Sequence, residues 1–152
     1  MLRIEPTADD ALLVEHYRLH WHEMGVAEDA ARADWQAEAR RFLREARARD
    51  GLAAFAARDA AGAVIGTACC HLMPRAFPAF RQGDADRIGY VWGLYVRPGA
   101  RGRGVGGALV GRCVSHLKGL GCGRVLLHAG ARSAPLYRRL GFSPTHELAM
   151  PL

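Results

Sequence analysis

The segment Arg101–Gly107 restricts the folds open to this chain more than any other feature of the sequence. Four of its seven residues are glycines, and it separates an apolar stretch from a stretch with helical periodicity. The first turn of a helix exposes backbone N–H groups with a partial positive charge, and glycines leave room for an anion to approach them. The segment therefore predicts a strand-loop-helix unit with a phosphate-binding site where the helix begins.

In one register, Gly102, Gly104 and Gly107 form the GxGxxG pattern of dinucleotide-binding folds. Such folds place an acidic residue about 20 residues later, at the end of the next strand, whereas the next predicted strand ends at His128. Too few residues follow Gly107 for the rest of a dinucleotide fold. A P-loop is excluded because no Lys-Ser or Lys-Thr pair follows the glycines.

The spacing of apolar residues predicts four helices and several strands. The helices are expected from Thr7 to Gly25, Asp29 to Arg49, Gly104 to Gly119 and Ser133 to Gly141. The strands are expected to end at Ile4 and to cover Leu52–Arg58, Ala63–His71, Arg87–Arg97 and Arg124–His128, with one strand or a tight pair in Phe142–Leu152.

Three local signals add detail to this outline. Thr7 and Asp10 have the spacing of a capping box, which predicts the start of the first helix. The prolines and glycine of Leu72–Asp86 predict a loop. Gly93 lies inside an otherwise apolar strand, which indicates a bulge or the close approach of a ligand.

The 152 residues, half of them apolar, suffice for one domain over residues 1–152. The net charge of +6 is spread along the chain, so we expect a solvated basic surface; if it has a target, that target is a polyanionic small molecule or nucleic acid. The four cysteines show no CxxC spacing and are expected to be reduced thiols.

The longest apolar stretch, Leu52–Cys70, is interrupted by Arg58 and Asp59, so no membrane span is expected. The N-terminal sequence MLRIEP lacks the basic, apolar and small-residue zones of a signal peptide. We therefore expect a cytoplasmic protein.

In a second register, the motif Arg101-x-x-Gly104-x-Gly106 follows a strand that ends Leu94-Tyr95-Val96-Arg97-Pro98. This arrangement resembles the acyl-CoA signature of the GNAT superfamily of N-acetyltransferases. The motif Tyr137-x-x-x-Gly141-Phe142 is similar to the second motif of that family. The resemblance implies a single-domain α/β fold, with a mixed sheet of six or seven strands flanked by about four helices, and acetyl-CoA as the acyl donor.

The resemblance also implies which residues bind the donor. Backbone N–H groups of the glycine-rich loop would hold the pyrophosphate, and the pantetheine would lie between two parallel strands that splay apart. Where the family often has an asparagine, this chain has Gly130, and Ser133 could supply the missing contact. The expected cofactor-binding residues are Leu94, Tyr95, Val96, Arg101, Gly102, Arg103, Gly104, Val105, Gly106, Gly107 and Ser133.

By the same resemblance, Tyr137 donates a proton to the departing thiolate of coenzyme A. Many family members carry a glutamate near the position of Trp92 or Gly93, and this chain has none there. We expect His128 as the base that deprotonates the amine, with Glu23, water or an acceptor of low pKa as the alternatives.

His16, His20 and His22 have a spacing similar to that of metal ligands, but nothing completes a site, so no metal is expected. The first two helices would border the acceptor pocket, where His22, Glu23 or Asp34 could contact substrate.

The expected activity is acetyl transfer to a primary amine of a small molecule, without nucleic acid or membrane as partner; a homodimer stays open. The rival hypothesis is a non-catalytic acyl-CoA-sensing or nucleic-acid-binding regulatory module of the same fold.

Overall fold

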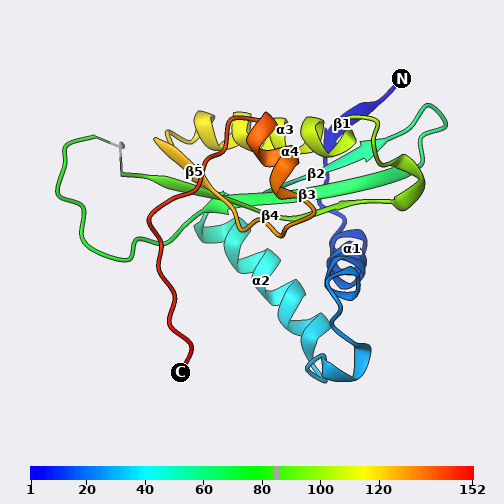
Figure 1. The fold of residues 1–152 in the computed structure, drawn as a ribbon, viewed down its shortest axis with the longest axis horizontal. Helices are drawn as coiled ribbons and strands as arrows, with labels where there is room; N and C mark the ends of the chain where they lie inside the picture. The colour runs from blue at the N-terminus through cyan, green and yellow to red at the C-terminus, as the bar shows by residue number, and fades with distance from the viewer. Residues whose placement is uncertain (84–85) are drawn as a thin grey trace.

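The computed structural model describes residues 1–83 and 86–152 and places a mixed five-stranded sheet between two layers of helices (Figure 1). The strands are β1 (Arg3–Pro6), β2 (Ala53–Arg58), β3 (Val64–Leu72), β4 (Ile88–Val96) and β5 (Arg124–Leu126). They lie in the order β1-β2-β3-β4-β5; only the pairing of β4 with β5 is parallel. The helices are α1 (Asp10–Glu23), α2 (Trp35–Arg49), α3 (Val105–Gly119) and α4 (Ala134–Arg139), with 3-10 turns η1 (Glu28–Ala30) and η2 (Pro98–Ala100).

The expectation of six or seven strands was wrong, because residues 142–152 form no strand. In Figure 1 this segment runs past β5 as an extended tail. Pro144 and Pro151 cannot donate to a ladder of strands, and Leu148 stays 96% exposed. The β5 strand is also shorter than expected, so His128 follows the strand instead of ending it.

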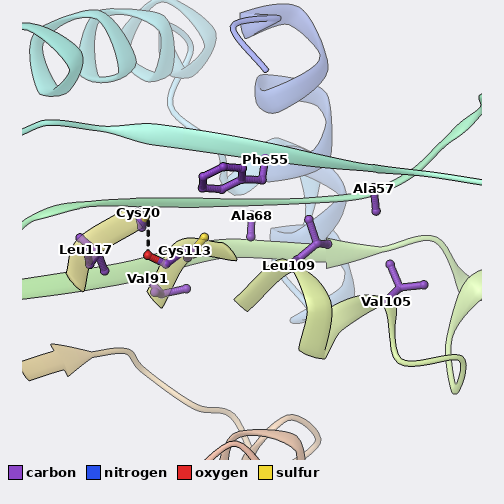
Figure 2. Close-up of a cluster of buried hydrophobic side chains, with 9 residues drawn as sticks. All are labelled: Phe55, Ala57, Ala68, Cys70, Val91, Val105, Leu109, Cys113 and Leu117. Carbon is purple, nitrogen blue, oxygen red and sulfur yellow. Dashed lines mark hydrogen bonds between the residues drawn. The ribbon is translucent and has the colours of Figure 1, made fainter. Parts of the chain in front are cut away.

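Alternation along the strands builds two apolar cores, one on each face of the sheet. The core under α3 contains Phe55 and Ala57 of β2 with Leu109, Cys113 and Leu117 of the helix (Figure 2). Within it, the Cys70 thiol lies 3.7 Å from the Cys113 carbonyl. The opposite core lies under α1 and α2, the helices that cover that face of the sheet in Figure 1, and contains Leu13, Val14, Leu43, Ala46, Leu52, Ala54 and Cys69.

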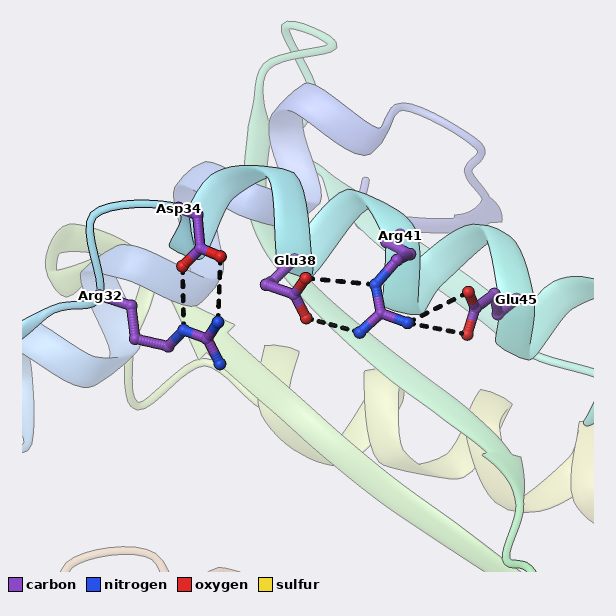
Figure 3. A network of polar contacts seen from close by, with 5 residues as sticks. All are labelled: Arg32, Asp34, Glu38, Arg41 and Glu45. Carbon is purple, nitrogen blue, oxygen red and sulfur yellow. Dashed lines mark hydrogen bonds and ion pairs between the residues drawn. The ribbon is translucent and has the colours of Figure 1, made fainter.

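The first two helices begin later than the sequence predicts. The Thr7 N–H donates to the Ala54 carbonyl at 2.9 Å, which keeps Thr7 beside the sheet, and Asp9 caps α1 by accepting from the Leu12 N–H at 3.0 Å. The second helix begins at Trp35 instead of Asp29. Between η1 and this helix, Arg32 binds the carboxylate of Asp34, which therefore makes no side-chain cap (Figure 3).

Other predicted features are confirmed. The β2–β3 hairpin turns at Asp59, whose carboxylate accepts from the N–H groups of Ala61 and Ala63, both at 2.9 Å. The loop between Leu72 and Asp86 has no helix or strand over residues 73–83; residues 84–85 of that prediction lie outside the described residues. All four cysteines are free thiols. No helix among the described residues combines the length and apolarity needed to cross a membrane.

The β4 strand carries the bulge that Gly93 predicts. Cys69 of β3 pairs with Trp92, and Thr67 pairs with Tyr95. Between these two pairs β4 therefore contains one residue more than β3. Gly93 takes a φ of +62°, which favours glycine. On its other side β4 pairs with β5 only from Ile88 to Tyr90, so the two parallel strands part just before the bulge.

Candidate active site

A cleft of about 1550 Å³ opens where β4 and β5 part. One wall comes from α1 and α2, the floor from β4, and the other wall from the start of α3, the segment after β5 and α4. The cleft therefore brings together segments far apart in the sequence, as is usual for a ligand site in a sheet with a parallel pair.

The N-terminus of α3 opens onto this cleft without a capping side chain. Gly104 occupies the cap position with a φ of +79°, and the Ala108 N–H donates to its carbonyl at 3.0 Å. The N–H groups of Val105, Gly106 and Gly107 precede the first intrahelical bond and are left for an external acceptor. No acidic residue lies in the first turn, so the positive end of the helix dipole is not neutralised there.

Most of the predicted cofactor-binding residues line the cleft. They are Leu94, Tyr95, Val96, Arg101, Gly102, Gly104, Val105, Gly106, Gly107 and Ser133. Arg103 does not line it and is exposed to solvent. Gly106 packs closely against α4 and leaves little room for a side chain, because a Cβ there would lie 3.2 Å from Leu136 Cδ2.

Arg101 links the glycine-rich loop to its neighbours. Its Nε donates to the Val96 carbonyl at 2.8 Å, and its Nη2 donates to Glu23 Oε1 at 2.5 Å. The guanidinium thus ties together the end of β4 and the end of α1. Because the Glu23 carboxylate is engaged in this ion pair, it is poorly suited to act as a free base.

Tyr137 lies buried in α4 and lines the cleft. Its ring packs against Phe142, with centroids 5.9 Å apart. Burial raises the pKa of the Tyr137 hydroxyl, and a hydrogen bond with Ser133 partly opposes this change. The hydroxyl therefore stays protonated at neutral pH, as a proton donor must.

His128 lines the cleft beyond the end of β5, where it is exposed. Its Nδ1 shares a hydrogen bond with the hydroxyl of Tyr90 on β4, and the two rings lie 5.6 Å apart. A hydroxyl can either donate or accept, so this bond allows both neutral tautomers of the imidazole. Burial raises the pKa of Tyr90, which keeps its proton available for the bond.

His71 is a cleft residue that sequence reasoning missed. The Trp92 indole Nε1–H donates to His71 Nδ1 at 2.9 Å. Because an indole N–H can only donate, this bond leaves the proton of neutral His71 on Nε2. His71 thus presents a donor, not a basic nitrogen, while burial lowers its pKa. Tyr90 was also missed, although its position two residues before Trp92 places both on one face of the strand.

The α1 histidines do not form a cluster. His16 is buried, and its Nδ1 lies 2.9 Å from Thr67 Oγ1. His20 lines the cleft, whereas His22 and Asp34 do not. Among residues 1–83 and 86–152, no three His, Cys, Asp or Glu side chains are arranged to hold a metal ion.

Comparisons with known proteins agree with this geometry. Residues 13–142 match the profile described as "Acetyltransferase (GNAT) family". A glucosamine 6-phosphate N-acetyltransferase from Trypanosoma brucei brucei is 32% identical over 91 residues, which are 60% of this chain and 58% of that protein. This chain thus spans less than two thirds of that relative's length.

Solved structures share the fold along the whole chain. A GCN5-related N-acetyltransferase from Ralstonia eutropha JMP134 is 25% identical with a TM-score of 0.83, covering 100% of this chain and 99% of that one. A protein from Clostridium acetobutylicum described as a "predicted acetyltransferase", solved with acetyl-CoA, is 23% identical with a TM-score of 0.84, covering 100% of this chain and 96% of that one.

Proposed function

Because this chain belongs to the GNAT family of acetyltransferases, we propose that it transfers the acetyl group of acetyl-CoA to the primary amine of a small acceptor. Residues 1–152 then act as one catalytic domain. The observation that carries the proposal is the uncapped N-terminus of α3, which opens onto the same cleft as the gap between β4 and β5 and the hydroxyl-bearing Tyr137.

The pyrophosphate of acetyl-CoA fits the loop from Gly102 to Gly107. The unpaired N–H groups at the start of α3 donate to its oxygens, and the helix dipole favours its negative charge. Arg101 fixes the loop through its bonds to Val96 and Glu23 and does not need to touch the phosphate. Ser133, at the start of α4, supplies a hydroxyl on the same wall of the cleft as this loop.

The pantetheine arm then lies where β4 has no β5 partner, along Leu94, Tyr95 and Val96. The bulge at Gly93 turns the backbone of this stretch out of the regular ladder. A backbone N–H aimed at the thioester carbonyl would stabilise the oxyanion as the amine attacks, a contribution of about 3 kcal/mol per donor.

The reaction is a direct attack of the neutral amine on the thioester carbon. A C–N bond forms, the C–S bond breaks, and the amine gives up a proton while the departing thiolate takes one. Tyr137 supplies the proton to the sulfur, because its raised pKa keeps it protonated. The products are the N-acetylated acceptor and coenzyme A with a free thiol.

His128 is the proposed base for the amine. Its bond to Tyr90 orients the ring beside the cleft floor and permits the tautomer in which Nε2 is free to accept a proton. His71 is disfavoured because its Nδ1 is occupied by the Trp92 indole, and Glu23 because it pairs with Arg101.

Two measurements test the proposal. Acetyl-CoA at a hundred times its dissociation constant should raise the free energy of unfolding by about 2.7 kcal/mol, with a melting shift of about 5 to 10 °C, whereas NADH should give no comparable shift. Steady-state release of free thiol from acetyl-CoA with a panel of amines tests turnover. A chain that binds acetyl-CoA but releases no amine-dependent thiol would instead be a sensor.

A further inference from the structure

The acceptor side of the cleft is lined by a continuous series of aromatic rings, called here the aromatic wall. It runs from α1 across α2 and β3 to β4 and the segment after β5. Its members, all lining the cleft, are Trp21, Tyr17, Trp92, Phe42, His71, Tyr90 and His128. Successive rings lie 5.4 to 6.2 Å apart, within the range of favourable edge-to-face and tilted pairs.

Trp92 stands at the centre of the aromatic wall. Its ring meets Tyr17 at 5.9 Å and 88°, and Phe42 at 5.4 Å and 86°. The hydrogen bond to His71 fixes the orientation of the indole ring. Since Trp92 directly precedes Gly93, the centre of the aromatic wall lies beside the bulge where the thioester would be held.

Several of these rings remain open to solvent. Phe42 is 47% exposed and Trp21 is 40% exposed, and Met24, which also lines the cleft, is 60% exposed. Single exposed aromatic residues need no explanation, but exposed apolar side chains gathered on one concave surface mark a binding site.

The charged residues on the same side of the cleft already have partners. Glu23 binds Arg101, Arg32 binds Asp34, and Glu38 binds Arg41, the last two pairs being drawn in Figure 3. These partners balance the charges on this side of the cleft, while Arg132 and Arg139 line the opposite wall. Burial lowers the pKa of His20 and His71, so neither offers a positive charge at neutral pH.

Building on the proposed function, we propose that the acceptor is an arylalkylamine: a primary amine on a short alkyl chain that carries a flat aromatic ring. The ring packs on the aromatic wall near Trp21 and Phe42, and the amine reaches past Trp92 to the bulge. Electron-rich ring faces also attract the ammonium form on its way in, before the base removes the proton.

The test compares acceptors that differ in one property. We expect kcat/KM for 2-phenylethylamine to exceed that for 2-cyclohexylethylamine, its saturated counterpart, by about three- to tenfold, because only the flat ring makes aromatic pairs. It should also exceed that for glucosamine 6-phosphate by about tenfold, because a sugar phosphate has no flat ring to pack on the aromatic wall.

A matched pair of variants locates the binding surface. Phe42→Ala should raise the KM for 2-phenylethylamine about tenfold or more and leave the KM for acetyl-CoA unchanged. Phe80→Ala removes the same ring at a position that is 98% exposed and outside the cleft, so it should change neither value. Both wild-type positions are exposed enough for the variants to fold.

The outcomes separate the two proposals. Faster acetylation of glucosamine 6-phosphate or of the saturated amine, or an unchanged amine KM in Phe42→Ala, would overturn the arylalkylamine assignment and leave the acetyltransferase proposal intact. The same holds if acetyl-CoA binds but no arylalkylamine is acetylated. If acetyl-CoA neither stabilises the protein nor releases thiol with any amine, both proposals fail.

Discussion

The guanidinium of Arg101 holds the carboxylate of Glu23 at 2.5 Å, joining the glycine-rich loop to the end of α1. This pair is partly exposed, with 34% and 33% of the two side chains accessible. Exposed ion pairs contribute little to the free energy of unfolding, so this pair matters mainly because it fixes the position of the loop relative to α1. It couples a wall of the acceptor side to the loop proposed for the pyrophosphate.

The first prediction follows from that pair. Glu23→Gln should lower the free energy of unfolding by less than about 1 kcal/mol and keep the shape of the pH-rate profile, because the carboxylate is a tether and not the base. Arg101→Ala also loses the bond to Val96 and should raise the KM for acetyl-CoA about tenfold. A lost pH limb in Glu23→Gln would instead identify Glu23 as the base.

The second prediction tests the start of α3 as an anion site. Gly107→Glu places a carboxylate beside the free N–H groups, and its Cβ meets only ordinary contacts at 3.7 Å from Leu140. Acetyl-CoA affinity should fall more than tenfold, while the free protein keeps its melting temperature or gains slightly, since an acidic residue suits a helix N-terminus.

Gly111 provides the control for that variant. It lies on the same helix, is exposed and does not line the cleft, and a Cβ added there would meet no neighbouring element within 4 Å. Gly111→Glu should therefore leave acetyl-CoA affinity within about twofold of wild type. Equal losses in the two variants would mean that the added charge acts at a distance and not at a phosphate site.

The third prediction concerns Tyr137. Tyr137→Phe keeps the ring against Phe142 and removes only the hydroxyl, so the melting temperature should stay within a few degrees. The KM for acetyl-CoA should change little, and kcat should fall by about 10²- to 10⁴-fold. Full turnover in this variant, with chemistry shown to be rate-limiting, would assign Tyr137 to packing alone.

The fourth prediction concerns the proposed base. His128→Ala should lower kcat by about 10²- to 10⁴-fold and leave the KM for acetyl-CoA unchanged, because it removes the group that accepts the proton of the amine. Tyr90→Phe removes only the partner hydroxyl and should give a smaller loss of kcat. Unchanged turnover in His128→Ala, with chemistry shown to be rate-limiting, would favour water or an acceptor that arrives deprotonated.

The fifth prediction is a pH dependence of stability. Burial lowers the pKa of His16 from its ordinary value of 6.5, so the unfolded chain binds a proton at a higher pH than the folded one. The contribution of His16 to the free energy of unfolding is therefore complete above pH 6.5. It decreases as the pH drops below that value, by at most about 1.4 kcal/mol per pH unit for one group. Urea unfolding from pH 8 to 5 should show this slope together with contributions of the same sign from His20 and His71, whose pKa values burial also lowers, and His16→Gln should reduce the slope by the share of His16.

The parts of the fold that the sequence predicts well are those set by local patterns. The third helix was predictable from its glycine-rich start and the spacing of its apolar residues, and the bulge from a glycine within an apolar strand. The C-terminal segment could not be predicted, because its alternating Leu148 and Met150 resemble a strand while no neighbouring strand pairs with them. Strand pairing is a tertiary property that spacing alone does not contain.

The candidate site also has parts that the sequence predicts and parts that it does not. The glycine-rich loop and Tyr137 follow from motifs at fixed spacing, and the structure brings them to one cleft. The aromatic wall could not be predicted, because its rings come from separate elements and meet only when α1 and α2 pack on β4. His71 is an example. Its place in the site becomes visible only when the strand register sets it opposite Tyr90 and the Trp92 indole donates a hydrogen bond to it.

The extra residue at Gly93 also resets the phase of β4. Val91 packs into the core under α3 and Trp92 against the opposite core, yet Leu94 and Val96 return to the α3 side, while Tyr95 meets His16 of α1. Strict alternation from Val91 would give these last three residues the opposite faces. Forcing these residues into a regular ladder without removing any of them would thus turn the Tyr95 ring into the α3 core. Deleting Gly93 would instead remove the bulge, match two residue steps on β4 to two on β3, and leave Leu94, Tyr95 and Val96 on their present faces. The bulge therefore lets β4 hold one residue more than its partner strand while every later side chain keeps its face.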